Sequence, residues 1–212
     1  MSKSKGNILD PLEIIEKYGI DPLRYYLIKE VSFGNDGNIS RERLENCINS
    51  DLANNFGNLC QRVLAFTEKN LSLKVPKPDV FSSDDLILLN NFTNNYDNLI
   101  DYIDNQNINL YMNFIVEQMF LANKYFNDQE PWKKKDNKIR LNTIIYTSLE
   151  LIRKISLLLY PVIPNSALKA LSIFDIKEND LNIETIKNNS FLTHNISLNK
   201  IDILFNKVEL HD

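Results

Sequence analysis

The stretch Ile48–Phe66 places apolar residues at the three- and four-residue spacing that forms one face of an α-helix. An apolar face of this length has to be buried, so this helix is expected to pack against a core. The apolar residues of the face are Ile48, Leu52, Phe56, Leu59, Val63 and Phe66.

A row of polar residues runs along one flank of this apolar face. At about 100° per residue, Asp51, Asn55, Asn58 and Arg62 fall on the same side of the helix. Amide and guanidinium groups offer directional donors and acceptors, which reading the edge of a nucleic-acid base requires. An ordinary solvated flank has the same pattern, and the helix by itself favours that simpler interpretation. We expect Asp51 to orient Arg62 or to cap a neighbouring group.

Similar apolar spacing, interrupted by prolines, glycines and asparagines, predicts helices along most of the chain. We expect two short helices near the N-terminus, capped by Asp10 and Asp21, and another short helix capped by Asn165 or Ser166. Longer helices are expected over residues 41–70, 84–103, 110–126 and 138–160.

The segment after Asp175 shows only partial alternation of apolar and polar residues. It is expected to be a short strand or an extended tail laid back on the helices. Together the elements predict a mainly α fold, an antiparallel helix bundle with a small N-terminal appendage and an extended C-terminal tail. The expected segments are residues 1–35, 36–175 and 176–212.

The composition excludes several classes of protein. The 212 residues are 43% hydrophobic, enough for one main core, and the net charge of −4 argues against a surface that grips nucleic acid without discrimination. Cys47 and Cys60 form neither a disulfide framework nor a zinc pattern, which fits a reducing cytosol. No apolar run reaches the roughly 20 residues of a membrane span, and the N-terminus is too polar for a secretory signal. His194 and His211 are isolated, and we assign them no role.

A proline and a tryptophan interrupt the helical pattern near residue 131. Pro131 ends the preceding helix and biases Glu130 toward an extended conformation, so Trp132 is expected at a rigid corner close to the surface. An indole at such a corner can stack on an unpaired base, and it can equally be a lid on the end of the bundle. The cations that follow could hold RNA phosphates or could form an ordinary charged helix start. They are Lys133, Lys134, Lys135, Lys138 and Arg140.

The first seven residues, MSKSKGN, are typical of a mobile loop whose lysines and hydroxyls could surround phosphates, and equally of a frayed terminus.

Six motifs along the chain, taken together in their order and at their spacing, resemble those of methionyl-tRNA synthetases, a family of class I aminoacyl-tRNA synthetases. MSKSKGN resembles the KMSKS signature loop without its first lysine, DPLRYYL is similar to GADALRYYLL, and FGNDGNIS is similar to FGxDGxFS. DLANNFGNLCQR, NKYFNDQEPW and PVIPNSALKAL match the family's D-L-A-N-x-x-G-N-L-x-x-R helix, N-x-Y-x-x-x-x-P-W corner and P-x-(I/M)-P segment.

The resemblance covers residues 1 to about 171. Leucyl-, isoleucyl- and valyl-tRNA synthetases share the loop and a helical domain but do not usually combine these motifs. The resemblance implies a stem-contact segment followed by a helical anticodon-binding domain. The implied contacts are Lys3, with Ser2 and Ser4, for the phosphates of ATP, and Asn58, Arg62, Pro131 and Trp132 for the anticodon.

The activity implied by the resemblance is that of a methionine--tRNA ligase. Such an enzyme activates methionine with ATP and Mg²⁺ and transfers it to tRNA(Met), whose anticodon is CAU. The family's Rossmann half, with its HIGH-type motif, is not among these 212 residues. We therefore expect a truncated part of the enzyme that does not aminoacylate tRNA alone and binds no cofactor, located in the cytoplasm and away from membranes. A free-standing tRNA-binding helical module and a helical interaction domain without a role in RNA binding are the alternatives.

Overall fold

The structure, a computed structural model, describes residues 10–30 and 39–210. These residues form helices and no β-strand, which confirms the mainly α prediction. None of the helices in the described ranges combines the length and apolarity needed to cross a membrane. The α-helices are α1 Pro11–Tyr18, α2 Ile20–Glu30, α3 Arg41–Cys47, α4 Asn58–Leu71, α5 Ser83–Asn94, α6 Tyr96–Asp104, α7 Ile108–Gln129, α8 Lys138–Leu159 and α9 Pro164–Leu171. A π-helix, η1 Ile48–Gly57, joins α3 to α4, and the short 3₁₀-helices are η2 Pro131–Lys133, η3 Ser172–Phe174, η4 Glu178–Asp180 and η5 Ile183–Lys187.

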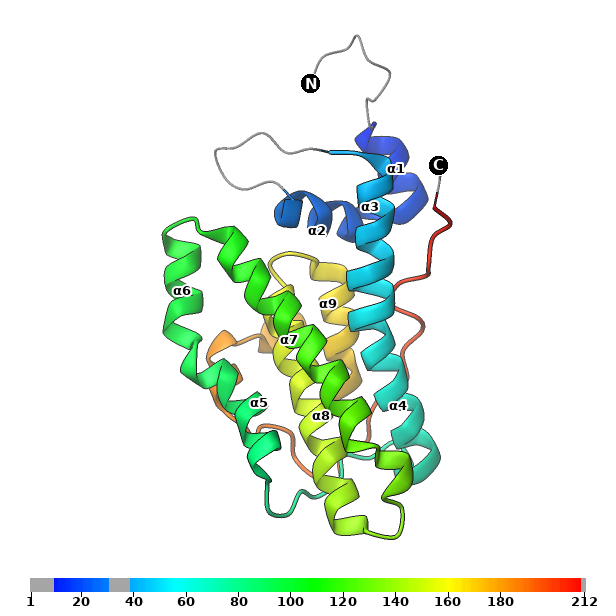
Figure 1. Cartoon of the computed structure of the whole chain (residues 1–212), viewed down its shortest axis with the longest axis vertical. Coiled ribbons are helices and arrows are strands. Elements are labelled where there is room, and N and C mark those ends of the chain that lie inside the picture. Colours follow the sequence, from blue (N-terminus) through cyan, green and yellow to red (C-terminus); the bar gives the residue numbers. More distant parts are fainter. Residues whose placement is uncertain (1–9, 31–38, 211–212) are drawn as a thin grey trace.

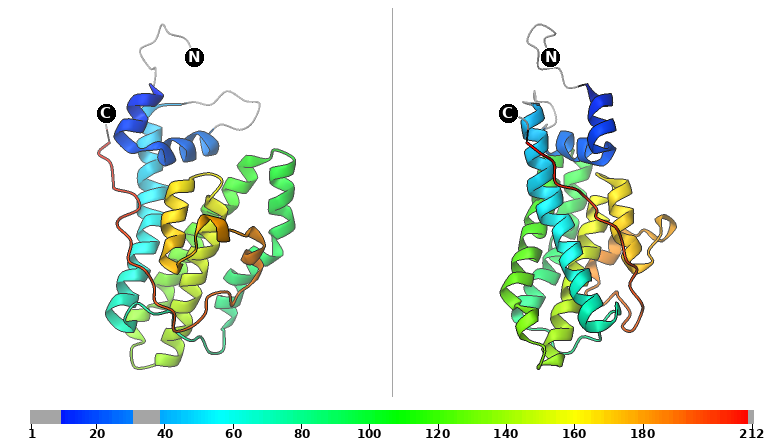
Figure 2. Two further views of the ribbon diagram at one scale, coloured as in Figure 1. Left: turned by 180° about the vertical axis from the view of Figure 1, so that it is seen from behind. Right: turned by 90° about the vertical axis from the view of Figure 1, so that its right-hand side faces the viewer.

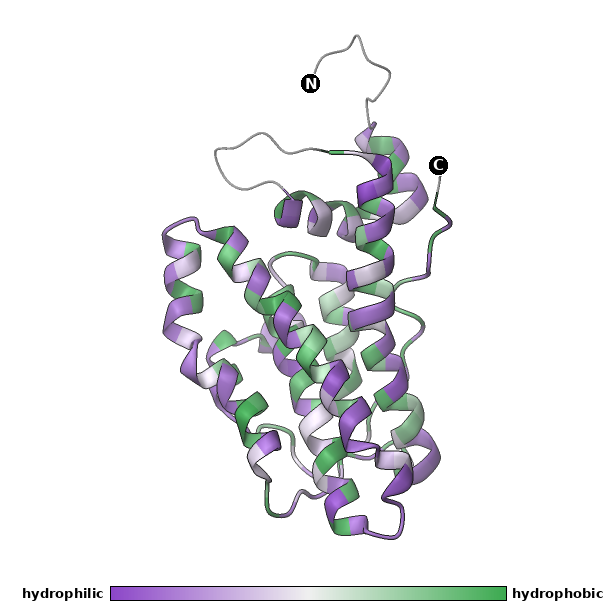
Figure 3. Ribbon diagram, viewed as in Figure 1, coloured by the Kyte–Doolittle hydropathy of each residue, from purple (hydrophilic) through white to green (hydrophobic). Residues whose placement is uncertain are grey.

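The helices form an elongated bundle around α8 (Figure 1). Helix α8 packs against α7 and α9, and nearly all of its residues from Leu141 to Leu159 are buried. The rod formed by α3, η1 and α4 runs along one side of the bundle, α5 and α6 flank the other side, and α1 and α2 cross one end (Figure 1). Apolar residues gather where helices face one another (Figure 3), as burial of amphipathic helices requires.

The long helix predicted over residues 41–70 is present as this continuous rod, but its middle is not α-helical. Residues Ile48–Gly57 form a π-helix, in which each backbone N–H donates to the carbonyl oxygen five residues earlier, instead of four residues earlier as in an α-helix. The angle of 100° per residue does not apply there, so positions deduced from it shift around the axis. Gly57 suits this tight stretch, because a Cβ atom at that position would lie 3.0 Å from the Leu52 carbonyl oxygen.

The single helix predicted over residues 84–103 is wrong, because the chain breaks at Asn95 into α5 and α6. Asn95 lies outside the helical region of backbone angles (φ −103°, ψ 4°), and its side-chain amide donates to the Asn91 carbonyl oxygen over 2.9 Å. Asparagine competes in this way with the helical hydrogen bonds, and this ends α5.

One of the two predicted N-terminal helix caps serves a different helix from the one expected. Asp10 caps α1 as expected, accepting from the Leu12 N–H over 2.9 Å. Asp21, expected to cap its own helix, instead accepts from the backbone N–H of Ser166 over 2.6 Å, at the start of α9. The predicted capping of α9 by Asn165 or Ser166 is therefore wrong, and the buried Asp21 fixes the N-terminal helices to the bundle.

The C-terminal tail begins with the short helices η4 and η5, and residues 188–210 then run without helix or strand back along the bundle, which agrees with the predicted extended tail (Figure 2). Val75 donates to the Ile196 carbonyl oxygen over 2.9 Å, and Leu198 donates to that of Leu73 over 2.7 Å. Further along, the Asn49 side chain exchanges two hydrogen bonds with the backbone of Val208. The expected segment boundaries near residues 35 and 175 stay predictions, and residue 35 lies outside the described residues.

Candidate nucleic-acid interface

Arg62 on α4 and Trp132 on η2 come together around one open hollow of about 390 Å³, which we call the Trp132 hollow. Sequence reasoning singled out both residues, and they belong to elements far apart in the chain. The structure brings them together at the end of the bundle where α7 turns into η2. The other lining residues are Ala65, Phe66, Lys69, Asn70, Phe126 and Lys135.

The Trp132 hollow has an aromatic wall centred on Phe126. Phe126 meets Phe66 edge-on, with 6.3 Å between ring centroids, and meets Trp132 at 6.2 Å with an interplanar angle of 66°. The Trp132 side chain remains 41% exposed, so its expected surface position is confirmed. A half-exposed indole held by a second aromatic ring offers a flat apolar surface on which a base can stack.

Arg62 is held in place on the side of the hollow facing α7. Its Nη2 donates to the Asn127 side-chain oxygen over 2.7 Å, and its guanidinium carbon lies 5.2 Å from the Phe126 ring centroid. A guanidinium carries five N–H donors, and this hydrogen bond uses one of them. The group is therefore oriented while further donors stay available to an acceptor in the hollow.

The rest of the predicted polar row divides into separate environments. Asn58 is half-buried one turn before Arg62 but does not line the Trp132 hollow. Asn55 turns toward α7, where its side-chain oxygen accepts from Asn123 over 2.6 Å. The row is thus not one continuous reading surface, because its first part lies in the π-helical stretch.

Asp51 faces α2 and not Arg62. It accepts from the Lys29 ammonium over 2.6 Å and from the Tyr25 hydroxyl over 3.0 Å, and it is buried. The expectation that it orients Arg62 is therefore wrong, while the alternative, that it satisfies neighbouring groups, holds. Burial and the adjacent Asp51 carboxylate raise the pKa of the Tyr25 hydroxyl, so Tyr25 stays protonated and keeps donating.

The corner that carries Trp132 differs from the prediction in one residue. Glu130 adopts the left-handed conformation (φ 44°, ψ 58°) rather than an extended one, and the buried Pro131 begins η2. Two hydrogen bonds close the turn, from the backbone N–H of Lys133 to the Glu130 carbonyl oxygen and from the Lys134 ammonium to the Gln129 carbonyl oxygen. The bias of residues that precede proline is overridden here by these contacts.

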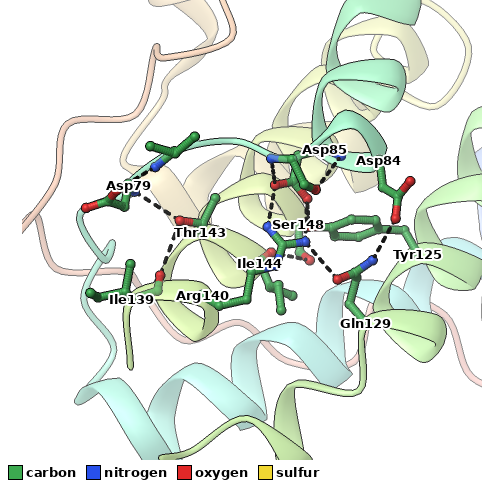
Figure 4. Close-up of polar contacts among 12 residues, drawn as sticks. Asp79, Asp84, Asp85, Tyr125, Gln129, Ile139, Arg140, Thr143, Ile144 and Ser148 are labelled. Carbon is green, nitrogen blue, oxygen red and sulfur yellow. Dashed lines mark hydrogen bonds and ion pairs between the residues drawn. The ribbon is translucent and has the colours of Figure 1, made fainter. Parts of the chain in front are cut away.

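The cations after Trp132 have different environments. Lys135 lines the Trp132 hollow and Lys138 is exposed, whereas Lys133 pairs with Glu130 at 2.8 Å. Arg140 makes two hydrogen bonds to the buried Asp85, of 2.5 and 2.9 Å (Figure 4). Its guanidinium is engaged inside the bundle, which favours, for Arg140, the alternative of a charged helix start over the holding of RNA phosphates.

The environment of Asp85 explains why it forms a charged pair with Arg140. Burial alone raises the pKa of a carboxyl group, but hydrogen bonds from Arg140 and Tyr125 outweigh it and hold the pKa of Asp85 below its ordinary value. Asp85 also accepts from the backbone N–H of Ser82 and so completes a capping box at the start of α5.

Sequence reasoning missed Lys69, Asn70 and Asn127 as members of this region. A signal was available, since residues 62, 66, 69 and 70 recur at the spacing of one helical face. The sequence places Phe66 on the apolar face of its helix, and in the structure both Phe66 and Phe126 contribute to the core and to the wall of the hollow.

The predicted phosphate-binding residues Ser2, Lys3 and Ser4 lie outside the described residues, as does His211. Their roles stay predictions. Within the described ranges, no group of three or more His, Cys, Asp or Glu side chains is placed to hold a metal ion.

Comparison with known proteins gives two family matches. Residues 75–212 match the family model described as the anticodon binding domain of methionyl tRNA ligase, and residues 1–64 match the model described as tRNA synthetases class I (M). Methionine--tRNA ligase of Brucella suis is 41% identical over 177 residues, which are 83% of this chain and 34% of that protein. The enzyme of Caldanaerobacter subterraneus is 36% identical over 213 aligned residues, 99% of this chain and 33% of that protein.

A solved structure agrees with these matches. Mycobacterium tuberculosis methionyl-tRNA synthetase in complex with methionyl-adenylate superimposes with a TM-score of 0.89 and 36% identity, over 97% of this chain and 41% of that chain. The present chain spans about a third of the length of the curated relatives it matches.

Proposed function

Because this chain belongs to the methionyl-tRNA ligase family, we propose that it forms the tRNA-recognition part of a methionine--tRNA ligase. The Trp132 hollow receives an unpaired base of the anticodon loop. One observation supports this assignment above the others. Arg62 and Trp132, from separate elements, meet at Phe126 as an oriented donor beside a half-exposed aromatic face.

Each wall of the Trp132 hollow has its own role in the proposed complex. Trp132 stacks on the base, a contact worth about 1–3 kcal/mol, and the buried Pro131 holds the corner. Arg62 donates to the oxygen or nitrogen acceptors on the edge of that base, and Asn58 reaches a neighbouring group one turn away. Lys69 and Lys135 border the hollow, where they neutralise phosphates without reading sequence.

The recognised RNA in this proposal is tRNA(Met) with its CAU anticodon. Lys3, supported by Ser2 and Ser4, contacts the phosphates of ATP. Its positive charge stabilises the negative charge that develops on the departing pyrophosphate when methionine is activated with ATP and Mg²⁺. These steps also require the nucleotide-binding half of such an enzyme, so we expect the 212-residue chain itself not to aminoacylate tRNA. We place the protein in the cytoplasm, where tRNA is charged.

Binding of anticodon stem-loops tests the assignment. A labelled stem-loop with a CAU loop should bind the 212-residue chain at least about tenfold more tightly than one with the same loop bases scrambled. Fluorescence anisotropy at moderate salt measures both affinities under conditions that weaken non-specific attraction. Equal affinity for the two loops would exclude specific anticodon recognition by this chain.

A further inference from the structure

The end of α7 is fastened from the side opposite to the Trp132 hollow. Asn127 faces Arg62 and the hollow, and Gln129, two residues further along the helix, points about 200° away toward α5 and α8. The Gln129 side-chain oxygen accepts from Arg140 over 2.7 Å, and its amide nitrogen donates to Asp84 over 3.3 Å (Figure 4). The last residue of α7 is therefore tied to both neighbouring helices.

Arg140 connects this glutamine to a rigid anchor. It binds Asp85 through two parallel hydrogen bonds, and the Asp85 side chain is fully buried. Tyr125 on α7 donates to the same carboxylate over 2.5 Å. A two-bonded guanidinium and carboxylate pair fixes direction as well as distance. The position of the Gln129 side chain is thus defined by α5 and α8 together.

The corner directly after Gln129 depends on such support. Glu130 is in the left-handed conformation, which is unfavourable for a residue other than glycine and persists only where its surroundings enforce it. Trp132 follows two residues later, and within the described ranges its ring contact is with Phe126, at an edge. The direction of the indole is therefore set mainly by the backbone path out of α7.

We propose that Gln129, Arg140 and Asp85 are positioning residues for Trp132. They hold the end of α7 so that the indole faces the Trp132 hollow. This inference rests on the proposed function only where it concerns RNA affinity, because the orientation of Trp132 can be measured without RNA. We assign none of the three residues a contact with the base, since none of them lines the Trp132 hollow and their polar groups are bonded to one another.

Replacement of Gln129 separates positioning from general stability. Gln129 is only partly buried, and Gln129→Met keeps its length while removing both hydrogen bonds to Arg140 and Asp84. Gln118→Met is the control, at a more deeply buried position. It replaces a glutamine on the same helix that also faces α5, contacts Asn91 at 3.3 Å and lies three turns before the corner.

Trp132 is the single tryptophan of the chain, so its fluorescence reports the corner directly. In the 212-residue chain, Gln129→Met should change the quenching of Trp132 fluorescence by acrylamide. It should also weaken binding of the CAU stem-loop about fivefold. The melting temperature should stay within about 2 °C of the wild type. Gln118→Met should leave quenching and affinity unchanged. Asp85→Asn should shift quenching in the same direction as Gln129→Met, together with a lower melting temperature.

The outcomes distinguish the two proposals. Unchanged quenching and unchanged affinity in Gln129→Met would overturn the positioning role and leave the proposed function standing. Altered quenching in Gln129→Met, with a wild-type chain that does not prefer CAU loops, would support the positioning role and overturn the proposed function. An equal change in Gln118→Met would mean that any loss of a glutamine on α7 disturbs Trp132, and it would overturn the assignment to Gln129.

Discussion

Arg62 and Asn127 are joined by a hydrogen bond of 2.7 Å that links α4 to α7 at the edge of the Trp132 hollow. Together with the stacking of the guanidinium on Phe126, this bond holds Arg62 in one direction before any ligand arrives. A side chain oriented in advance loses less conformational entropy on binding, so the bond contributes to affinity without contacting RNA.

Loss of the Arg62 side chain should weaken RNA binding more than loss of the Asn127 side chain does. We predict that Arg62→Ala costs about 1–3 kcal/mol in binding of the CAU stem-loop, because the variant loses the donors themselves. Asn127→Ala should cost about 0.5–1.5 kcal/mol, the net value of the orienting bond. Titration calorimetry measures both affinities, and Asn113→Ala, an exposed asparagine on the same helix, is the control. An Asn127→Ala variant that binds as well as the wild type would show that Arg62 needs no such support.

Trp132 should act in binding far more than in folding. Trp132→Ala is expected to lose about 1–3 kcal/mol of loop binding through the missing stacked base. Its melting temperature should change little, because the side chain is 41% exposed. Thermal denaturation followed by circular dichroism and anisotropy on the same samples compares the two effects. A large loss of stability with unchanged affinity would instead identify Trp132 as a lid on the end of the bundle.

The two neighbouring lysines should differ in their effect on salt dependence. Lys135 borders the Trp132 hollow, whereas Lys133 is paired with Glu130. Lys135→Ala should therefore weaken all stem-loops similarly and reduce the slope of log K against log salt by up to about 1. Lys133→Ala should act in the same direction but more weakly, because part of its charge is already compensated. Affinities measured at several salt concentrations give these slopes, and identical slopes for both variants would contradict the distinction.

The sequence predicted those parts of the fold that depend on local periodicity. The apolar faces, the Asp10 cap and the corner at Pro131 follow from residue spacing and from backbone chemistry within a few positions. The exceptions arose where tertiary partners compete with local preference. Asp21 caps a helix far along the chain, and Glu130 takes a left-handed conformation.

The same limit applies to the candidate site. Periodicity placed Asp51 and Arg62 on one flank, but the π-helix separates them and turns Asp51 toward Lys29. The apolar spacing of the sequence does not indicate a π-helix, whose hydrogen bonds reach one residue further back than those of an α-helix. Arg140 was grouped with the lysines by charge alone, since its partner Asp85 lies in a different helix.

The buried Lys154 should make stability depend on pH. This lysine of α8 is fully buried, and its ammonium donates to the Ile186 carbonyl oxygen and to the Asn189 side chain, each over 2.6 Å. Burial is the main effect on its titration and lowers its pKa to about 7, against attraction from Glu150. The unfolded chain, in which the lysine keeps an ordinary pKa, therefore binds more protons above pH 7 than the folded chain does.

The sign of the dependence follows from this difference in bound protons. A state that binds more protons is disfavoured as pH rises, so the titration of Lys154 should increase the free energy of unfolding between pH 7 and about 8. Nearer the ordinary cysteine pKa of about 8.5, the two cysteines oppose this increase, because burial raises their pKa values in the folded chain. Lys154→Met removes the group and should flatten this increase. Urea denaturation at several pH values measures the free energy of unfolding of both proteins. Parallel curves for the variant and the wild type would show that Lys154 keeps its charge throughout this range, held by its carbonyl partners.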